Sequence, residues 1–495
     1  MSREPSEAAG VLATGRTATG PERPEGTLTA PRAAGSLASG PIFGRMTELA
    51  FATLCTNLLQ NAQGSINALW IGRLLDGDAL AASYSVNLVI YVISTLVFGF
   101  GLAATILVGQ KLGLGDIAAA RRAFGASIGL CISAGVALSI LAWVCGAQIL
   151  SVMNAPPETF TLALSYLRML LFSTPAAFLL LLINMGLRAA GDARTPLFVM
   201  AWLLLGDAAL NPIFISGLGP IPAFGIGGSG LATTISTFTG LIGLIATIYA
   251  RDMPLRLRGR ELRFVWPSRT LARVLTAKGL PITLQSFVLA AGSFTMAGLV
   301  NREGAHAIAA FSAAAQVWIY LQMPANAVGA AVSAMAAQSI GAERSERLRP
   351  ILRTGLIEGC LVTLTVAAAS MGFGRLVLGI FIPADSSSLH LAEHIVDVTA
   401  LSYVLVTASA ILMSLVRAHG AVVAPFIISA VTMLPVRLGL AIALHPVLGA
   451  EALWWSVPLS SAVSLVLAWL YYANGSWRHA RADATRESDR MRGRR

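Results

Sequence analysis

The sequence predicts an all-α integral membrane protein with about twelve transmembrane helices, in two parallel six-helix repeats around a central cavity. Composition, recurring apolar runs and an internal repeat support this fold class. Of the 495 residues, 56% are hydrophobic and only 12% are charged, whereas soluble domains average about 25% charged residues. The mean hydropathy is +0.72. A soluble fold of this length could not bury so much apolar surface.

Apolar runs of roughly 20 residues, long enough to cross about 30 Å of hydrocarbon, recur along the chain. In the first half the predicted spans lie near 46–71, 80–107, 123–146, 162–187, 195–216 and 228–250. In the second half they lie near 273–300, 307–334, 351–376, 393–416, 424–444 and 450–473. The chain thus divides into a six-helix lobe, a basic linker and a second six-helix lobe, at residues 45–250, 251–272 and 273–473.

The two ends of the chain contain no apolar run. Residues 1–44 are rich in Ala, Gly, Thr, Pro and Arg and lack the continuous apolar region of a signal peptide. We expect this segment to be a disordered cytoplasmic tail. Residues 474–495 are basic and are predicted to form a second cytoplasmic tail.

The positive charge of the chain indicates its orientation. The formal net charge is +11, but the basic residues lie in short connections between apolar spans, which favours a topology signal over nucleic-acid binding. One alternate set of connections is basic, and the other set is poor in Lys and Arg. The positive-inside rule therefore predicts that both termini and the linker are cytoplasmic, and an even number of spans agrees with this.

Two sequence motifs recur in the second half of the chain. Gly109-Gln110-Lys111-Leu112-Gly113 is matched by Ala337-Gln338-Ser339-Ile340-Gly341, 228 positions later. Gly186-Leu187-Arg188-Ala189-Ala190-Gly191 is matched by Leu415-Val416-Arg417-Ala418-His419-Gly420, 229 positions later. Each half has an even number of spans, so both halves enter the membrane in the same direction and the repeat is parallel. Two such bundles facing a cavity are the arrangement that alternating access requires.

Enzymes and ATP-driven pumps are not favoured. The sequence contains no HExxH, no GxSxG and no GxxxxGK[ST] phosphate loop. All four cysteines fall inside apolar spans, and none has a CxxC spacing. We therefore assign no catalytic residue, metal ligand or cofactor, and expect only H⁺ or Na⁺ as a coupling ion.

Several short stretches, in order and spacing, resemble one transporter family. They are Ile71-Gly72-Arg73-Leu74, Gly109-Gln110-Lys111-Leu112-Gly113, Leu187-Arg188-Ala189-Ala190-Gly191-Asp192, Gly225-Ile226-Gly227-Gly228-Ser229-Gly230-Leu231-Ala232-Thr233 and Gly279-Leu280-Pro281-Ile282. Together, over about residues 45–473, they resemble the multidrug and toxic compound extrusion (MATE) family of secondary transporters. The resemblance implies two six-helix lobes and export of amphiphilic compounds, driven by inward flow of Na⁺ or H⁺.

The resemblance also indicates where a cation site would lie, with departures from the family pattern. Asn67 stands where the family has an aspartate on the first span. Asp207 and Asn211 exchange the places of the family's amide and carboxylate on the fifth span. Thr233 matches a threonine of the same site in some members. Carboxylates of the second lobe in other members have no match near Leu289 or Val406.

Asp207 is the strongest candidate on physical grounds as well. It lies about a dozen residues into its span, roughly 18–20 Å from the cytoplasmic end at 1.5 Å per residue. Intramembrane acids are costly to bury and usually face a cavity or a partner. Asp207 could take up a proton from outside and release it inside, with Asn211 orienting it one turn later. A protonated acid that only holds helices together is the alternative.

Two further sets of polar residues lie within spans. Asn57, Gln60 and Asn61, with Gly64 and Asn67, recur at helical spacing on the first span. They would line a cavity or form hydrogen bonds between packed helices.

Arg437 lies twelve residues after Pro425, much as Asp207 lies eleven after Pro196, at almost the same depth. Three roles fit Arg437: an ion pair with Asp207, a site for an anionic head group, or a side chain that reaches the outer interface.

The sequence therefore predicts a secondary active antiporter that exports amphiphilic, cationic drugs or toxins in exchange for H⁺ or Na⁺. The alternative is a flippase for a lipid-linked precursor, which Arg437 and the missing second-lobe acids favour, because a lipid phosphate binds a cation. We expect a monomer in a bacterial cytoplasmic (inner) membrane, since Ala, Gly and Arg dominate over Lys as in a GC-rich genome.

Overall fold

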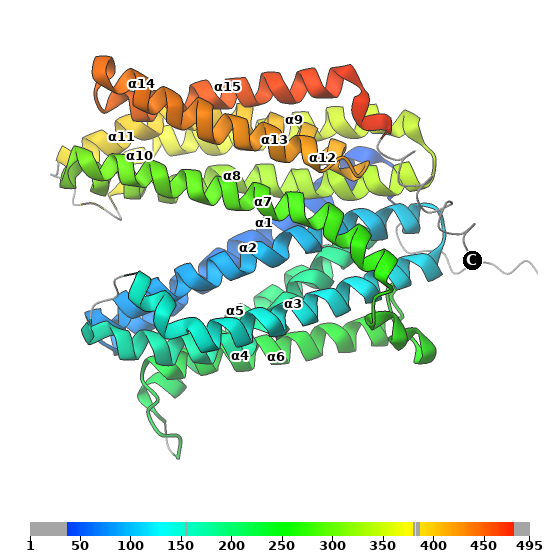
Figure 1. Cartoon of the computed structure of the whole chain (residues 1–495), viewed down its shortest axis with the longest axis horizontal. Helices are drawn as coiled ribbons and strands as arrows, with labels where there is room; N and C mark the ends of the chain where they lie inside the picture. Colours follow the sequence, from blue (N-terminus) through cyan, green and yellow to red (C-terminus); the bar gives the residue numbers. More distant parts are fainter. Residues whose placement is uncertain (1–36, 154–156, 219, 380–381, 383–386, 480–495) are drawn as a thin grey trace, which may run out of the picture. The chain divides into compact units, whose positions relative to one another are not determined.

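The computed structural model describes residues 37–479 except 154–156, 219, 380–381 and 383–386, and the regular elements of these residues are helices (Figure 1). Those of the first half are α1 Ile42–Leu74, α2 Gly77–Gly113, α3 Ile117–Val152, α4 Pro157–Ala190, α5 Arg194–Ser216 and α6 Ile226–Ala250. The linker holds one short helix, η1 Gly259–Val265.

The second half repeats this order with more interruptions. Its long helices are α7 Arg269–Val300, α8 Ala305–Gly341, α9 Leu348–Gly372, α11 Ser387–Ala400, α12 Ser402–Ala418, α13 Val423–Val431, α14 Gly439–Leu448 and α15 Glu451–Asn474. The short ones are η2 Asn301–Glu303, η3 Ser345–Arg347, α10 Gly374–Leu378, η4 Thr432–Leu438 and η5 Ser476–His479.

The helices of the described residues account for the predicted membrane spans. Nine helices or joined helices are long and apolar enough to cross a membrane, and the bent pair α11–α12 is a tenth. Helices α1 and α8, of 33 and 37 residues, are the two remaining candidates. Their apolar character is diluted, in α1 by a polar stripe and in α8 by many alanines together with Gln316, Gln322 and Gln338.

Local capping explains where several helices begin. Asp76 and Asp116 accept hydrogen bonds from the backbone N–H groups of Ala79 and Ala119, at the starts of α2 and α3. Asp192 accepts from the N–H and the hydroxyl of Thr195, at the start of α5. Such caps satisfy N–H groups that have no partner within the helix.

Two predicted spans of the second half are not continuous α-helices. The span predicted at 393–416 bends by 41° between α11 and α12. There the Ser402 hydroxyl donates to the Thr399 carbonyl at 2.6 Å and the Thr399 hydroxyl donates to the Ile395 carbonyl at 2.7 Å, contacts that bend helices.

The span predicted at 424–444 contains the π-helix η4, which includes Pro435. Proline has no N–H to donate to the helix, and a π-turn accommodates one additional residue. The sequence pattern of apolar residues carries no signal for this change in helix type.

The two repeated sequence motifs bind each other across the lobes. Gln110 of α2 donates to the Ala418 carbonyl at 2.7 Å, and Gln338 of α8 donates to the Ala189 carbonyl at 2.7 Å. We call these four residues the linker-end contact, because they lie at the end of the helix bundle that carries the linker (Figure 1). A Cβ atom on Gly113 would collide with the Gln338 carbonyl, so this contact depends on glycine.

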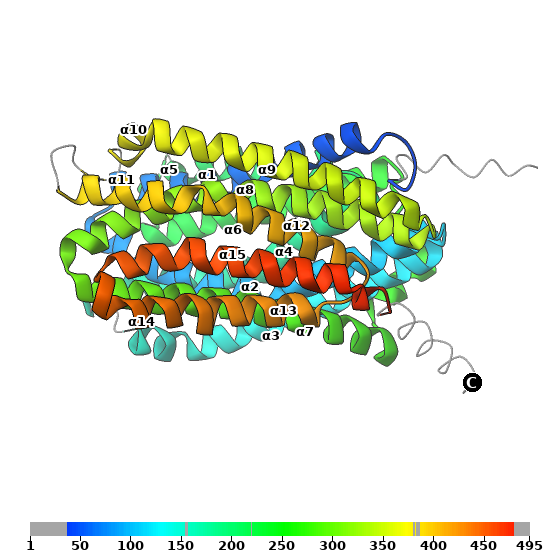
Figure 2. The same ribbon diagram turned by 90° about the horizontal axis from the view of Figure 1, so that it is seen from above.

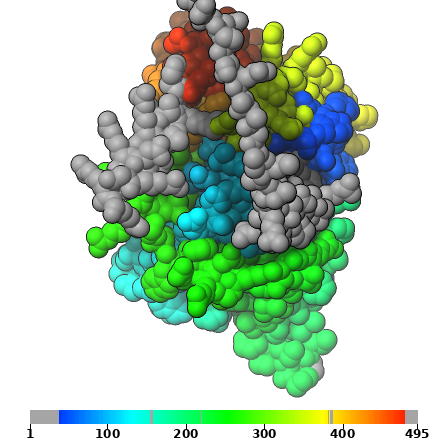
Figure 3. All heavy atoms as spheres, turned by 90° about the vertical axis from the view of Figure 1, so that its right-hand side faces the viewer, coloured from blue at the N-terminus to red at the C-terminus, as the bar shows by residue number. Residues whose placement is uncertain are grey.

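The linker packs against the first lobe at the same end. Arg121 of α3 donates to the Pro254 carbonyl at 2.9 Å and forms an ion pair with Glu261 at 3.2 Å. Figure 3 looks onto this end, where green atoms of the linker region lie beside blue-cyan atoms of the α2–α3 region. Two basic connections that the sequence predicts on the same side of the membrane, the linker and the segment at the start of α3, therefore lie next to each other in the fold.

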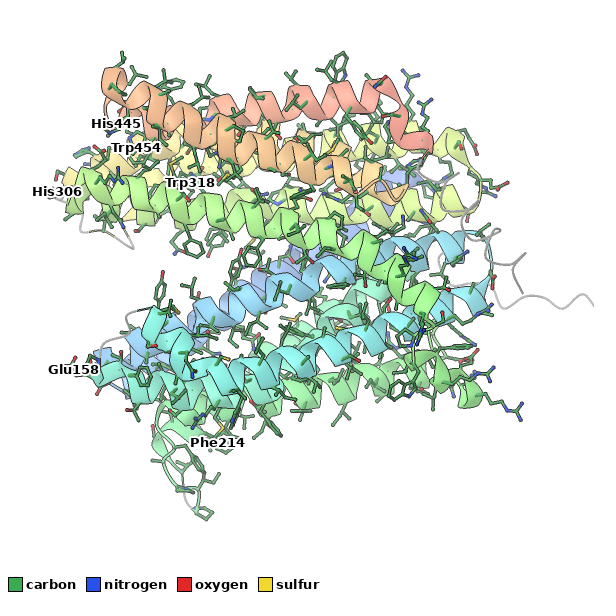
Figure 4. All side chains as sticks on the ribbon, viewed as in Figure 1. Glu158, Phe214, His306, Trp318, His445 and Trp454 are labelled. Carbon is green, nitrogen blue, oxygen red and sulfur yellow. The ribbon has the colours of Figure 1, made fainter. Side chains whose placement is uncertain are left out.

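The lobes make their polar contacts between this end and the middle of the helices. The Thr283 hydroxyl of α7 donates to the Leu96 carbonyl of α2 at 3.1 Å. Among the described residues, no hydrogen bond or ion pair joins the lobes nearer the opposite end, where Figure 4 places Glu158, His306 and His445. The two lobes are thus fastened to each other mainly at the linker end.

Most of the predicted tails lies outside the described residues. Of the segment 1–44, residues 37–44 are described: the Leu37 N–H donates to the Gln338 side-chain oxygen at 2.8 Å, and α1 begins at Ile42. The start of α1 packs with Met46 and Leu49 into an apolar cluster with α8, α9 and α12. The first helix therefore contacts both lobes.

Candidate functional site

The candidate site is built around a carboxyl group at the middle of α5. Asp207 and Asn211 lie four residues apart, so they share one face of the helix, and each side chain is fully buried. Leu205, on another face of α5, is 67% exposed. This difference in burial places the polar face of α5 against α1 and α6 inside the first lobe.

Three neutral groups from three helices donate to the Asp207 carboxylate. These are the Gln63 amide of α1 at 3.0 Å, the Asn211 amide of α5 at 3.1 Å and the Thr233 hydroxyl of α6 at 3.0 Å. Among the described residues, Asp207 forms no ion pair. When Asp207 is ionised, its charge therefore has hydrogen-bond donors but no counter-charge among these residues.

Asn67 connects these donors to each other. Its amide group donates to the Thr233 hydroxyl at 3.3 Å, and its side-chain oxygen accepts from Asn211 at 2.9 Å. The side-chain oxygen of Asn211 is buried and accepts no hydrogen bond from the described residues. The cluster thus offers carboxylate, amide and hydroxyl oxygens, which are the ligands that hard cations prefer.

The structure brings together all four residues that the sequence suggested for cation coupling: Asp207, Asn211, Asn67 and Thr233. Their function stays a prediction. Sequence reasoning missed Gln63. A signal for it was present, because Gln63 lies one helical turn before Asn67 on the same face of α1. It also missed Tyr166 of α4, which is buried close to Asp207 and Ser229.

The rest of the polar stripe on α1 is arranged differently. The Asn61 side chain donates to the Asn57 carbonyl of its own helix at 2.9 Å, and Gln60 and Asn61 are exposed. None of the three residues Asn57, Gln60 and Asn61 forms a side-chain bond to another described helix. Interhelical hydrogen bonding by this part of the stripe is therefore not observed, and lining of an aqueous space stays a prediction.

Arg437 does not pair with Asp207 in this structure. Its Nε atom donates to the Ser460 hydroxyl of α15 at 2.9 Å, whereas the partners of Asp207 all belong to the first lobe. The proposed ion pair between these residues was wrong for this conformation, because each side chain points into its own lobe.

Comparison with known proteins now bears on this arrangement. A family model described as MatE matches the chain twice, over residues 52–213 and 281–443. The chain belongs to the MATE family. The two matches begin 229 positions apart, which agrees with the repeat seen in the sequence. This MATE protein is therefore a membrane transporter and not an enzyme.

Individual proteins extend the likeness over most of the chain. It is 30% identical to the probable multidrug resistance protein YoeA of Bacillus subtilis, over 85% of this chain and 91% of that protein. It is 24% identical to the probable multidrug resistance protein NorM of Thermotoga maritima, over 89% and 94%. A solved outward-facing structure of a multidrug resistance MATE family transporter matches with a TM-score of 0.81 and 20% identity, over 88% of this chain and 96% of that chain.

Proposed function

We propose that this MATE protein is a secondary active antiporter that exports amphiphilic drugs or toxins in exchange for H⁺ or Na⁺ by alternating access. The observation that carries the proposal is the fully buried Asp207 carboxylate, which has three neutral donors and no counter-charge among the described residues. An intramembrane acid of this kind is a functional site by default.

The cluster suits either coupling ion. A proton would neutralise Asp207 directly, and the oxygen of Asn211 that has no donor could then accept a hydrogen bond from a reoriented neighbour. A sodium ion would instead bind the oxygens of Asp207, Asn211 and Asn67, which lie within one hydrogen-bonded cluster. In both cases one positive charge replaces the missing counter-charge.

The distribution of contacts between the lobes supports alternating access. The linker-end contact closes one end, and the described residues form no polar contact between the lobes at the other end. Opening the linker end would break these two equivalent hydrogen bonds, each with a net worth of about 0.5–1.5 kcal/mol. It would also separate α1 from the second lobe, where the Thr47 hydroxyl donates to Glu358 and apolar side chains pack together, so opening requires a contribution from ion or substrate binding.

The substrate class and the location follow from the relatives and from the charge pattern. Two similar proteins from Bacillus and Thermotoga are named as probable multidrug resistance proteins, so we assign several amphiphilic substrates here. A positive charge on these substrates stays a prediction. We further propose a monomer in a bacterial cytoplasmic membrane, with both termini and the linker in the cytoplasm.

A lipid-linked precursor flippase is the second candidate. Arg437 favours it, because a basic side chain lies within the second lobe and has no carboxylate partner among the described residues. A lipid phosphate would provide the counter-charge. Under this alternative the protein moves a lipid between leaflets and exports no soluble dye.

Dye transport in proteoliposomes tests the proposal. The purified protein is reconstituted, a pH gradient or a sodium gradient is imposed separately, and movement of a fluorescent amphiphile is followed with and without the matching ionophore. We expect one gradient to drive transport and its ionophore to abolish it. If neither gradient moves the dye, while the protein still reorients a lipid between leaflets, the flippase is favoured.

A further inference from the structure

The second lobe carries a buried basic group where the first lobe carries its acid. Arg437 lies in η4, near the middle of the joined helix Val423–Leu448. It is separated from Leu448 by eleven residues, which is about 16 Å along a helix. That distance is longer than an arginine side chain, so the guanidinium does not reach the end of this helix.

The π-helix explains the position of Arg437 in the repeat. Pro196 and Pro425 are 229 positions apart, whereas Asp207 and Arg437 are 230 apart. A π-turn holds one more residue than an α-turn. Because η4 follows Pro425 and contains Arg437, it accounts for the one additional position. Arg437 therefore takes the place in the second lobe that Asp207 takes in the first.

The contacts of the two residues agree with this correspondence. Asp207 accepts from the Thr233 hydroxyl of the next span, α6, and Arg437 donates to the Ser460 hydroxyl of the next span, α15. Figure 2 shows α14 and α15 side by side, as the first lobe pairs α5 with α6. The lobes thus present opposite charges at corresponding positions.

Among the described residues, no acidic side chain forms an ion pair or a hydrogen bond with Arg437. Tyr403 of α12 lies close enough to interact electrostatically with Arg437. Ser460, which accepts the hydrogen bond of Arg437, is buried. In the described part of the second lobe, Glu303 and Glu451 instead pair with histidines, and Glu393 lies near Arg375 and His390. Four of the five guanidinium N–H donors accordingly have no acceptor among the described residues.

Apolar and aromatic side chains pack around Tyr403 and around Leu438, the residue after Arg437. Tyr403 belongs to a cluster that also holds Phe311, Trp318 and Trp454, with Phe311 stacked on Trp454 at a centroid distance of 6.1 Å. Figure 4 shows Trp318 and Trp454 within the second lobe. The guanidinium is only partly exposed, and its charge-assisted bonds are stronger in such surroundings than in water.

We propose that Arg437, positioned by its bond to Ser460, binds an anionic group, a carboxylate or a phosphate, on the amphiphile that this protein transports. The proposal rests on the transport function and names the substrate class: amphiphiles with an oxyanion, including zwitterions. A guanidinium matches the two oxygens of such a group with two parallel hydrogen bonds. If Arg437 only joined η4 to α15, its single hydrogen bond to Ser460 would be enough, and the other N–H donors of the guanidinium would have no role.

A matched pair of dyes tests the proposal. Rhodamine B carries a free carboxylate, and its ethyl ester masks this group on the same ring system. Binding of both dyes to the full-length protein is measured by fluorescence anisotropy, and transport is measured in proteoliposomes. We expect Arg437→Gln to weaken binding of rhodamine B about tenfold, which is about 1.4 kcal/mol, and to leave binding of the ester unchanged.

Two variants control for charge and for folding. Arg302→Gln removes an exposed arginine from the same lobe and should change neither dye. Arg437→Lys keeps the charge without the paired donors, and should give an intermediate loss for rhodamine B only. If Arg437→Gln does not give a monodisperse protein, the result for Arg437→Lys decides. Equal effects on both dyes, or none on rhodamine B, would overturn the proposal.

Two further readouts separate the possible outcomes. Binding that depends on Arg437, in a protein that moves neither dye under any gradient, would support the anion site while rejecting the antiport function. In nanodiscs, phosphatidic acid that displaces rhodamine B from the wild type, but not from Arg437→Gln, would identify a lipid phosphate as the source of the oxyanion. Equal displacement by diacylglycerol, which has no oxyanion, would contradict a site for an anionic group.

Discussion

At the scale of single residues, Asp207 is held by donors that carry no charge. Gln63, Asn211 and Thr233 come from three helices, so a small displacement of any one of them changes the stabilisation of the carboxylate. No ion pair has to break when Asp207 gains a proton or meets a cation. This arrangement lets a local ion-binding event alter the packing of α1, α5 and α6.

Gln63 and Gln60 form a matched pair for testing this idea. Both are glutamines on α1, but only Gln63 donates to Asp207, and Gln60 is exposed. Loss of a buried hydrogen bond to a charged group costs about 1.5–3 kcal/mol. We expect Gln63→Leu to lower gradient-driven transport at least about tenfold.

The control is the ion dependence of Gln60→Leu, measured as initial transport rate against Na⁺ or H⁺ concentration. It should match the wild type, even if the affinity for the dye changes. Equal losses of ion dependence in both variants would show that Gln63 has no special role.

At the scale of elements, the linker is fixed to α3 by an ion pair. Burial tends to raise the pKa of Glu261, but the N–H of Arg258 and the Arg121 guanidinium outweigh it and hold that pKa below its usual range. Because the folded-state pKa is depressed, the stabilisation is present above the ordinary glutamate value of about 4.3. It is lost as pH falls through the lower, folded-state pKa.

Trypsin cleavage within residues 251–268 measures this docking. We expect Glu261→Gln to be cleaved there several times faster than the wild type at neutral pH, because Arg121 loses its partner. Asp252→Asn is the control, since Asp252 pairs only with Arg256 and Arg258 inside the linker. Faster cleavage in the control alone would reject the role of Glu261.

Apolar runs located the spans of the first lobe, although α1 carries a polar stripe and is not among the helices that are apolar enough on their own. The predicted span 195–216 and α5 differ by one residue, and 228–250 and α6 by two at one end. The bend at Leu401 and the π-helix η4 were not predictable in this way, because they depend on hydroxyl bonds to carbonyls and on a proline inside an apolar run. The site residues were suggested by depth, polarity and resemblance, whereas Gln63 required the packing of α1 against α5.

At the scale of the whole transporter, the linker-end contact joins equivalent residues of the two repeats. Gln110 and Gln338 occupy equivalent positions and bind equivalent carbonyls at the same distance of 2.7 Å. Gln338 additionally accepts from the Leu37 N–H. The two glutamines should therefore contribute similarly to closure of this end, with a larger share from Gln338.

Replacement of these glutamines tests that difference. We expect Gln110→Leu to increase the population opened at the linker end, and Gln338→Leu to increase it further. Electron paramagnetic resonance distances between spin labels at exposed Arg122 and Glu346, in a cysteine-free background, measure the opening. Unchanged distance distributions in both variants would contradict a closing role for this contact.

The central claim is that Asp207 couples an ion gradient to transport. The most direct measurement is gradient-driven dye transport in proteoliposomes by the wild type, Asp207→Asn and Glu158→Gln, an exposed acid of the same lobe. The account predicts that Asp207→Asn folds, binds dye and loses gradient-driven transport by at least about a hundredfold, while Glu158→Gln behaves as the wild type. Gradient-driven transport that persists in Asp207→Asn would contradict it.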